Sequence, residues 1–520
     1  MSARHLLRNA QNGNFEAAVQ VFLNYRNGAQ DFEKNDEEAK LAFDHVVKTL
    51  KSSFFLNELT ISNFKKFLDI KINLNQNLTV FIGENGVGKT SLLEAIRRNL
   101  MWIAATTRKE NTNGGSIDRD EINNTNRRKG AYIDCEFQIG NICNYRGRVA
   151  CPPDGVPSDL KSELIKYREL GRNFRILNEY ADIDLPLFSY YGIDRLQITG
   201  KTAKKVIDFG KIDAYDQSLN DKTSFVTFVD WLIQTLKISK STFNVLEKRK
   251  IISQINVLIK AGANNKDNPL YEMYEDLIST LNLHPSDDEK NKSKKTLELL
   301  ETLFRKIYPS LTQIQLVNED DGKDKVALNL GDKTIYLHQF SDGQRVLFGL
   351  IGDIARRLIL LNNNHGNPFD GQGIVLIDEI ELHLHPGWQQ KVILMLRQSF
   401  PNIQFIVTTH SPHVLSTVDK SQIRIIKDNT IESVVLQTKG VASSDILEQI
   451  MGTYSVPFVE EAKWVNDYLL LVQNNSYESK EANELLEKLK KHFGNDHPVI
   501  SNIESQIKIS SLRKRIGQRG

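Results

Sequence analysis

A glycine-rich stretch that ends in lysine and threonine could bind a phosphate. Residues 83–90 read Gly-Glu-Asn-Gly-Val-Gly-Lys-Thr, which matches the pattern GxxxxGK[ST] between an apolar run and a helical pattern. Glycines let successive backbone N–H groups face a phosphate, and the helix N-terminus adds partial positive charge. We expect Lys89 to reach the β- and γ-phosphates of a nucleotide and Thr90 to bind Mg²⁺. The other residues expected around the phosphates are Gly83, Glu84, Asn85, Gly86, Val87, Gly88 and Ser91.

A second element that could do chemistry is an apolar strand that ends in two acids. The run 374–377 is Ile-Val-Leu-Ile, and Asp378 and Glu379 follow it. Parallel sheets present ligands at the carboxyl ends of their strands. We therefore expect Asp378 to hold Mg²⁺, directly or through water, and Glu379 to polarise an attacking water. Without the phosphate-binding pattern, two acids at a strand end could be only a solvated loop.

Two weaker elements complete the set. Ser341, Asp342, Gly343 and Gln344 lead into a helical pattern over 346–361, although this sequence also makes an ordinary helix N-cap and turn. His410 follows an apolar strand over 403–407. A histidine at a strand end is usually structural, but this one lies where a γ-phosphate sensor is expected.

The order of these four elements resembles the ABC-type ATPase family, in particular its soluble branch with the SMC, RecF and OLD-like proteins. The resemblance implies ATP and Mg²⁺ as cofactors, Glu379 as the catalytic glutamate and His410 as the switch histidine. It makes residues 341–344 the signature motif, with Asp342 in place of the glycine that is usual at the second site of this motif. It also implies an ATP-dependent dimer in which the signature of one subunit caps the nucleotide bound by the other.

Some neighbouring segments have no secure assignment. Gln138 is a candidate for the family's Q-loop, and the turn at 190–195 has no derived role. Residues 381–386 occupy the D-loop position and contain His383 and His385. Because two histidines lack a third ligand, a metal site there is disfavoured.

Hydrophobic patterns predict an α/β protein with helical appendages at both ends. The resemblance implies an ABC-type ATPase head whose mixed sheet is split by a helical insertion. The expected segments are a helical appendage (1–52), an ATPase lobe with the phosphate-binding motif (53–158), a mainly helical insertion (159–311), a second ATPase lobe (312–438) and a helical partner-binding region with a basic tail (439–520). The appendage could be a docking or oligomerisation element, or a lid on the main domain. The charge run 287–295 is interpreted as a solvated linker.

Composition excludes several classes of protein. Among 520 residues, 67 Lys+Arg against 65 Asp+Glu leave a net charge of +2, so the chain is not a uniformly basic nucleic-acid coat. No apolar run approaches the ~20 residues that span a bilayer, and no signal peptide is evident, so we expect a cytoplasmic protein. The three cysteines, Cys135, Cys143 and Cys151, are interpreted as reduced strand residues.

The same features narrow the kind of ATPase. Membrane transport needs spanning segments, and SMC-like bridging needs long heptad arms; neither is evident. Only about 80 residues follow the last sheet strands, and their pattern is helical, so no nuclease active site is expected in this chain. This tail resembles that of the ATPase (PtuA-like) subunits of Septu-type anti-phage systems, including those attached to retrons.

The Septu resemblance implies a separate HNH-type nuclease partner and, in retrons, a reverse transcriptase with its RNA–DNA product. The alternatives are a RecF-like DNA-repair ATPase and a nucleotide-dependent scaffold with little turnover. Residues 127–129 and a basic tail could contact nucleic acid, or could be ordinary solvated surface. The tail residues are Lys508, Arg513, Lys514, Arg515 and Arg519.

Overall fold

The structure is a computed structural model that divides into two compact units, Met1–Val441 and Ala442–Gly520. It describes residues 2–29, 31–51, 53–140, 142–153, 155, 157–195, 210–220, 225–240, 245–265, 268–282, 286–318, 324–363, 366–453 and 457–517. Each unit is considered by itself below. Among the described residues, no helix is long and apolar enough to cross a membrane.

Helices and strands alternate through the first unit, and the second unit is helical. The helices are α1 (Ala3–Gln11), α2 (Phe15–Asn27), α3 (Asp36–Leu50), α4 (Lys89–Arg108), α5 (Ile165–Tyr180), α6 (Val226–Lys240), α7 (Val245–Lys260), α8 (Tyr271–Asn282), α9 (Asp287–Arg305), α10 (Asp342–Leu361), α11 (Pro386–Ser399), α12 (Pro412–Leu415), α13 (Ser443–Gln449), α14 (Glu460–Gln473), α15 (Lys480–Phe493) and α16 (Pro498–Gly517). The strands are β1 (Phe54–Phe64), β2 (Phe67–Asn73), β3 (Leu78–Ile82), β4 (Ala131–Ile139), β5 (Cys143–Cys151), β6 (Leu187–Tyr191), β7 (Leu311–Asn318), β8 (Asp324–Leu330), β9 (Lys333–Tyr336), β10 (Gly373–Ile377), β11 (Ile403–Thr408), β12 (Ile423–Lys427) and β13 (Thr430–Ser433).

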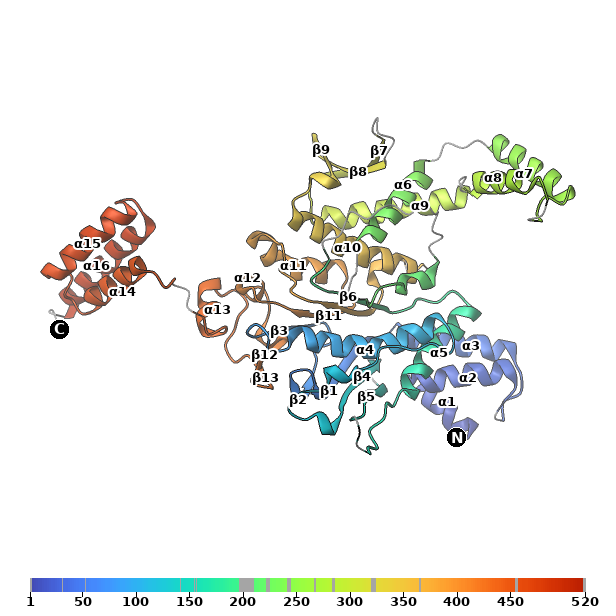
Figure 1. Ribbon diagram of the computed structural model, residues 1–520, viewed down its shortest axis with the longest axis horizontal. Coiled ribbons are helices and arrows are strands. Elements are labelled where there is room, and N and C mark those ends of the chain that lie inside the picture. Colours follow the sequence, from blue (N-terminus) through green and yellow to red (C-terminus); the bar gives the residue numbers. More distant parts are fainter. Residues whose placement is uncertain are drawn as a thin grey trace. The chain divides into compact units, whose positions relative to one another are not determined.

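The central six-stranded sheet has the order β13-β12-β3-β11-β10-β6, and only β13 is antiparallel to its neighbour. Every residue of β3, β10 and β11 is buried, as expected for parallel strands covered on both faces. Figure 1 shows this sheet between α4 on one side and α10 with α11 on the other. The carboxyl ends of β3, β10 and β11 therefore meet at one edge.

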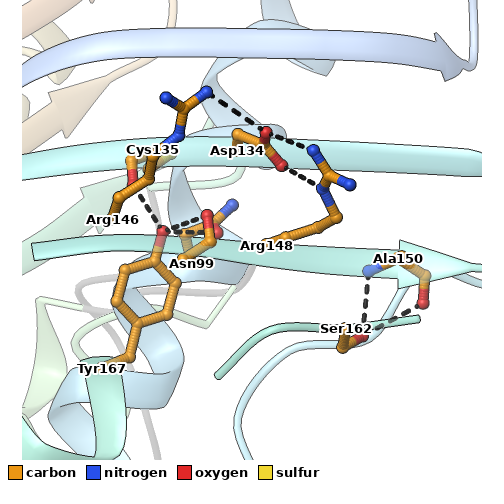
Figure 2. Close-up of polar contacts among 9 residues, drawn as sticks. Asn99, Asp134, Cys135, Arg146, Arg148, Ala150, Ser162 and Tyr167 are labelled. Carbon is orange, nitrogen blue, oxygen red and sulfur yellow. Dashed lines mark hydrogen bonds and ion pairs between the residues drawn. The ribbon is translucent and has the colours of Figure 1, made fainter. Parts of the chain in front are cut away.

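A second sheet, β2-β1-β4-β5, is antiparallel and is held to the helices by a tyrosine. Figure 2 shows Tyr167 of α5 pointing its hydroxyl between β4 and β5. That hydroxyl lies 2.8 Å from the carbonyl oxygen of Cys135, 2.9 Å from that of Gly147 and 3.1 Å from Oδ1 of Asn99. A β-carbon on Gly147 would lie 2.5 Å from the tyrosine ring, so β5 needs glycine where α5 crosses it.

The three cysteines lie on β4 and β5 and are free, as predicted. Asp134 of β4 is buried and forms two hydrogen bonds with Arg148 of β5, at 2.7 and 2.8 Å, which are also drawn in Figure 2. A buried carboxylate is tolerated when it is paired and hydrogen-bonded in this way. Arg146 of β5 also lies 3.6 Å from this carboxylate, so two arginines of the hairpin pair with Asp134.

The N-terminal helices α1, α2 and α3 pack on α5. The rings of Phe15 and Phe174 lie 6.0 Å apart, and Phe22 contacts Tyr180 edge-on at 4.8 Å. Lys166 of α5 forms an ion pair with Glu16 at 2.8 Å. These helices therefore pack on the main domain, and a docking or oligomerisation role for them stays a prediction.

Two expectations about the insertion are wrong. Strand β6 falls within the segment expected to be inserted, yet it pairs in parallel with β10 at the edge of the central sheet. The charge run 287–295 forms the first turns of α9, because Ser286 accepts a hydrogen bond from the N–H of Glu289 and Glu289 caps in return. This capping box begins a helix where the charges alone indicated a linker.

The helices α6 and α9 of the insertion pack on α10. Gly349 and Gly352 of α10 allow this contact, since β-carbons there would lie 2.3 and 2.2 Å from the rings of Phe225 and Phe228. Phe304 of α9 stacks on Phe348 of α10 with ring centroids 4.4 Å apart. The insertion is therefore anchored on the helix that begins with the expected signature motif.

The second unit contains a small three-helix cluster. Helices α14, α15 and α16 bury a common apolar core that includes Tyr468, Leu489 and Ile503. The helical character predicted for this region is present, and α13 precedes the cluster. Lys508 on α16 is exposed, whereas the side chains at 513–515 and residue 519 of the basic tail lie outside the described part.

We predict that Gly147→Ala lowers the free energy of unfolding by about 1–3 kcal/mol, because its new methyl group collides with the buried Tyr167 ring. Urea denaturation of the full chain measures the change. Gly366→Ala is the matched control, since a β-carbon there meets nothing within 4 Å, and its effect should stay within about 0.5 kcal/mol. Equal stabilities for the two variants would contradict the packing described.

Candidate functional site

The phosphate loop, residues 83–88, connects β3 to α4, and Lys89, Thr90 and Ser91 begin that helix, as the sequence predicted. Gly83 and Gly88 have φ values of +154° and +111°. A β-carbon on Gly83 would lie 2.6 Å from the carbonyl oxygen of Ile426, and one on Gly88 would lie 2.8 Å from the Phe67 ring. Only glycine fits at these positions, so the loop can bring its backbone close to a bound anion.

Lys89 lies across this loop. Its ammonium donates hydrogen bonds to the carbonyl oxygens of Gly83 at 3.0 Å and Glu84 at 2.8 Å. Burial lowers the pKa of Lys89, and the nearby carboxylates of Glu379 and Asp378 partly oppose that shift. The lysine is therefore placed beside both the loop and the two acids predicted to act with it.

Asp378 joins three elements at the edge of the sheet. Its carboxylate is 1% exposed and accepts a hydrogen bond from the Thr90 hydroxyl of α4 at 2.7 Å. The other oxygen accepts one from the Thr408 hydroxyl of β11 at 2.5 Å. The residues predicted to share Mg²⁺, Thr90 and Asp378, are thus in direct contact although 288 positions separate them.

Glu379 has an unusual backbone conformation. Its φ is +44°, in the left-handed region that is disfavoured for residues other than glycine. Its N–H donates to the Thr408 hydroxyl at 2.7 Å, and its carbonyl oxygen accepts from the guanidinium of Arg195 at 2.5 Å. Several contacts thus hold the predicted catalytic glutamate at the start of the loop after β10.

His410 is positioned through its backbone by Glu381. The carboxylate of Glu381 accepts hydrogen bonds from the His410 N–H at 2.5 Å and from the Thr409 hydroxyl at 2.7 Å. Desolvation lowers the pKa of His410, the positive charge of Lys89 lowers it further, and Glu381 among other carboxylates opposes the shift. Burial and the Lys89 charge therefore favour the neutral imidazole over the imidazolium.

The expected signature residues lie at the N-terminus of α10. Ser341 caps that helix in a capping box with Gln344, and the side chain of Asp342 is exposed. A β-carbon on Gly343 would lie 2.5 Å from the carbonyl oxygen of His383. In the described part of the chain, the structure therefore brings this segment against residues 383–384, in the loop after β10.

Comparison with known proteins fits this geometry. Residues 78–416, more than half of the chain, match the family described as "AAA domain, putative AbiEii toxin, Type IV TA system". The chain belongs to this AAA-domain family. Its central sheet and phosphate loop confirm the predicted α/β class and the ABC-type ATPase head, here with helical appendages at both ends.

Three curated relatives of this AAA-domain protein are informative. A protein named Retron Ec83 probable ATPase, from Escherichia coli, is 28% identical and the match covers 96% of both chains. Septu protein PtuA of Bacillus thuringiensis is 24% identical over 76% of this chain and 84% of its own. The DNA replication and repair protein RecF of Lactococcus lactis is 22% identical over 72% of this chain and 98% of its own. These likenesses confirm the resemblance to the defence and SMC–RecF branch.

The residues of this AAA-domain protein fit Mg²⁺ with a nucleotide. Among the described residues, no group of three or more His, Cys, Asp or Glu could hold a metal. Mg²⁺ does not require one, because it usually takes one or two carboxylates and completes its coordination with water and substrate phosphates. Thr90 and Asp378 provide that partial set beside the glycine cradle.

Sequence reasoning missed Arg195, Thr408 and Glu381. Arg195 ends the turn at 190–195, which the sequence singled out without a role. Thr408 lies two positions before the predicted His410. Both residues are therefore adjacent to segments that the sequence did identify. The candidate Gln138 does not lie beside the phosphate loop. It pairs with Phe55, nine residues or about 30 Å along β1 from Phe64. The end of β1 at Phe64 is the one near the loop, because Phe64 pairs with Phe67, whose ring lies against Gly88.

We predict that the His410 imidazole titrates below its ordinary value of 6.5 and that Lys89→Met raises its pKa, since the lysine charge disfavours the imidazolium. NMR titration of ¹³C-labelled histidine measures both. A depressed pKa in the folded state contributes stability that is present above pH 6.5 and is lost as pH falls through the folded value. The urea-unfolded chain is the reference, and a folded pKa at or above that of the unfolded chain would contradict this environment.

Proposed function

We propose that this chain is an ATP-hydrolysing regulatory subunit of a prokaryotic anti-phage defence complex, which controls a separate HNH-type nuclease through nucleotide-dependent assembly. The observation that carries the ATPase part is the contact of Thr90 with Asp378, 2.7 Å, beside the glycine cradle. The defence role is supported by similarity to the retron and Septu proteins over most of the chain.

In this mechanism the phosphate loop binds the triphosphate, and Thr90 and Asp378 hold Mg²⁺. When bound there, Mg²⁺ would neutralise charge on the phosphates. Lys89 supplies a positive charge beside the loop, and Glu379 accepts a hydrogen bond from the attacking water and orients it. Burial favours the neutral form of His410, and the one N–H of a neutral imidazole can donate a hydrogen bond to the γ-phosphate.

Nucleotide-dependent assembly is proposed from the signature segment. Ser341 and Asp342 are exposed at the first turn of α10. Backbone N–H groups at a helix N-terminus favour an anionic partner, although the carboxylate of Asp342 opposes this locally. We propose that this end of α10 faces the nucleotide held by a second copy of the chain.

The second candidate is a RecF-like DNA-repair ATPase. It is favoured by the RecF likeness, which extends over 72% of the chain. Arg127, Arg128 and Lys129 are exposed before β4 and could contact phosphates without reading sequence. The two functions differ in whether the chain assembles with a nuclease or acts on DNA by itself.

We predict that Lys89→Ala weakens ATP binding at least about 100-fold, whereas Glu379→Gln retains binding and lowers kcat by roughly 100-fold or more, because only the water-orienting carboxylate is lost. Nucleotide titration and phosphate release measure the two effects. The exposed residues Lys391 and Glu432 provide matched controls, Lys391→Ala and Glu432→Gln. Full turnover by Glu379→Gln would contradict the assigned role and favour a scaffold.

We predict that tagged Glu379→Gln, expressed from its native gene neighbourhood, traps the ATP-bound assembly and recovers a small HNH-type nuclease. A reverse transcriptase with an RNA–DNA product should accompany it if the system is a retron. Mass spectrometry and sequencing of bound nucleic acid identify what is recovered, with Lys89→Ala as the control that cannot reach the ATP state. Recovery of only chromosomal DNA and repair proteins would support the RecF-like alternative.

A further inference from the structure

Arg195 follows β6 and reaches the end of the neighbouring strand, β10. Its side chain is 1% exposed. One terminal nitrogen lies 2.5 Å from the carbonyl oxygen of Asp378, and the other lies 2.5 Å from that of Glu379. One guanidinium therefore bridges the two carbonyl groups of the residues proposed to bind metal and polarise water.

The chain needs such a contact at this point. A residue other than glycine costs about 1–2 kcal/mol in the left-handed region where Glu379 lies, φ +44°. Past the end of β10, the buried carbonyl group of Asp378 needs a donor, and Arg195 supplies one. The Glu379 carbonyl oxygen accepts from the Leu382 N–H at 2.9 Å, and the second arm of the Arg195 fork adds a further donor to it.

Other contacts hold the same peptide groups from the opposite side. The Glu379 N–H donates to the Thr408 hydroxyl at 2.7 Å, and the Ile380 N–H donates to the Thr408 carbonyl oxygen at 3.0 Å. Arg195 and β11 thus hold the Glu379 backbone from two sides. These hydrogen bonds involve backbone atoms of Glu379, so its carboxylate stays available for water.

We propose that Arg195 is a positioning residue for hydrolysis: its guanidinium fixes the backbone of Glu379, so that turnover, but not ATP binding, depends on it. The inference rests on the proposed ATPase function. Lysine cannot replace it, because an ammonium is a compact point charge, whereas the planar guanidinium presents two donors in a fixed fork. A misplacement of about 1 Å at a reacting group can cost roughly 100-fold in rate.

The test compares Arg195→Lys with a matched control, Arg356→Lys. Arg356 is equally buried, 1% exposed, but it bonds Asp353 within α10 at 2.8 and 3.1 Å. Purified full-length variants are compared by ATP affinity, kcat and thermal stability. We expect Arg195→Lys to keep ATP affinity within about threefold and to lose roughly 10- to 100-fold in kcat. Arg356→Lys should lower stability without a selective loss of kcat.

A variant that combines Arg195→Lys with Glu379→Gln separates a positioning role from a general loss of structure. If Arg195 acts only through Glu379, adding Arg195→Lys to Glu379→Gln should lower kcat no further than Glu379→Gln alone. Three outcomes would overturn the inference while leaving the ATPase function intact. The first is a wild-type kcat in Arg195→Lys, and the second is an equal selective loss of kcat in Arg195→Lys and Arg356→Lys. The third is a double variant whose loss of kcat is the product of the two single losses. No turnover by the wild-type chain would overturn both.

Discussion

The buried carboxylate of Asp378 is the constraint on which the rest of the site depends. A carboxylate that is 1% exposed must be hydrogen-bonded or paired, and here its partners come from the start of α4 and the end of β11. These partners meet only if β3, β11 and β10 are adjacent and parallel, which is the observed strand order. The contacts of Asp378 with Thr90 and Thr408 therefore require this strand order.

The local motifs could be predicted from the sequence because each one combines a residue pattern with a strand or helix that positions it. Residues 83–90 and Asp378 are of this kind, and their encounter follows from the parallel sheet. Arg195 could not be assigned, since its partners are backbone atoms 183 and 184 positions away and carry no residue-type signal. The placement of β6 was missed for a related reason: a short apolar run among helices looks the same inside or outside a sheet.

Helix α10 connects the remaining parts of the first unit. Its glycine face accepts the phenylalanines of the insertion, and its buried Asp353 accepts hydrogen bonds from Arg356, Arg357 and the Tyr191 hydroxyl. Desolvation disfavours the charged form of Asp353, but the two arginines prevail and lower its pKa to about 2. The helix that carries Ser341 is therefore tied to β6, the strand that precedes Arg195.

The close approach of Gly343 to the His383 carbonyl oxygen limits which residues the start of α10 can carry. A β-carbon at position 343 would lie 2.5 Å from that oxygen, a distance that real β-carbons essentially never show. Residue 383 lies four positions after Glu379. Any side chain at position 343 would therefore push the first turn of α10 away from the loop that carries the glutamate.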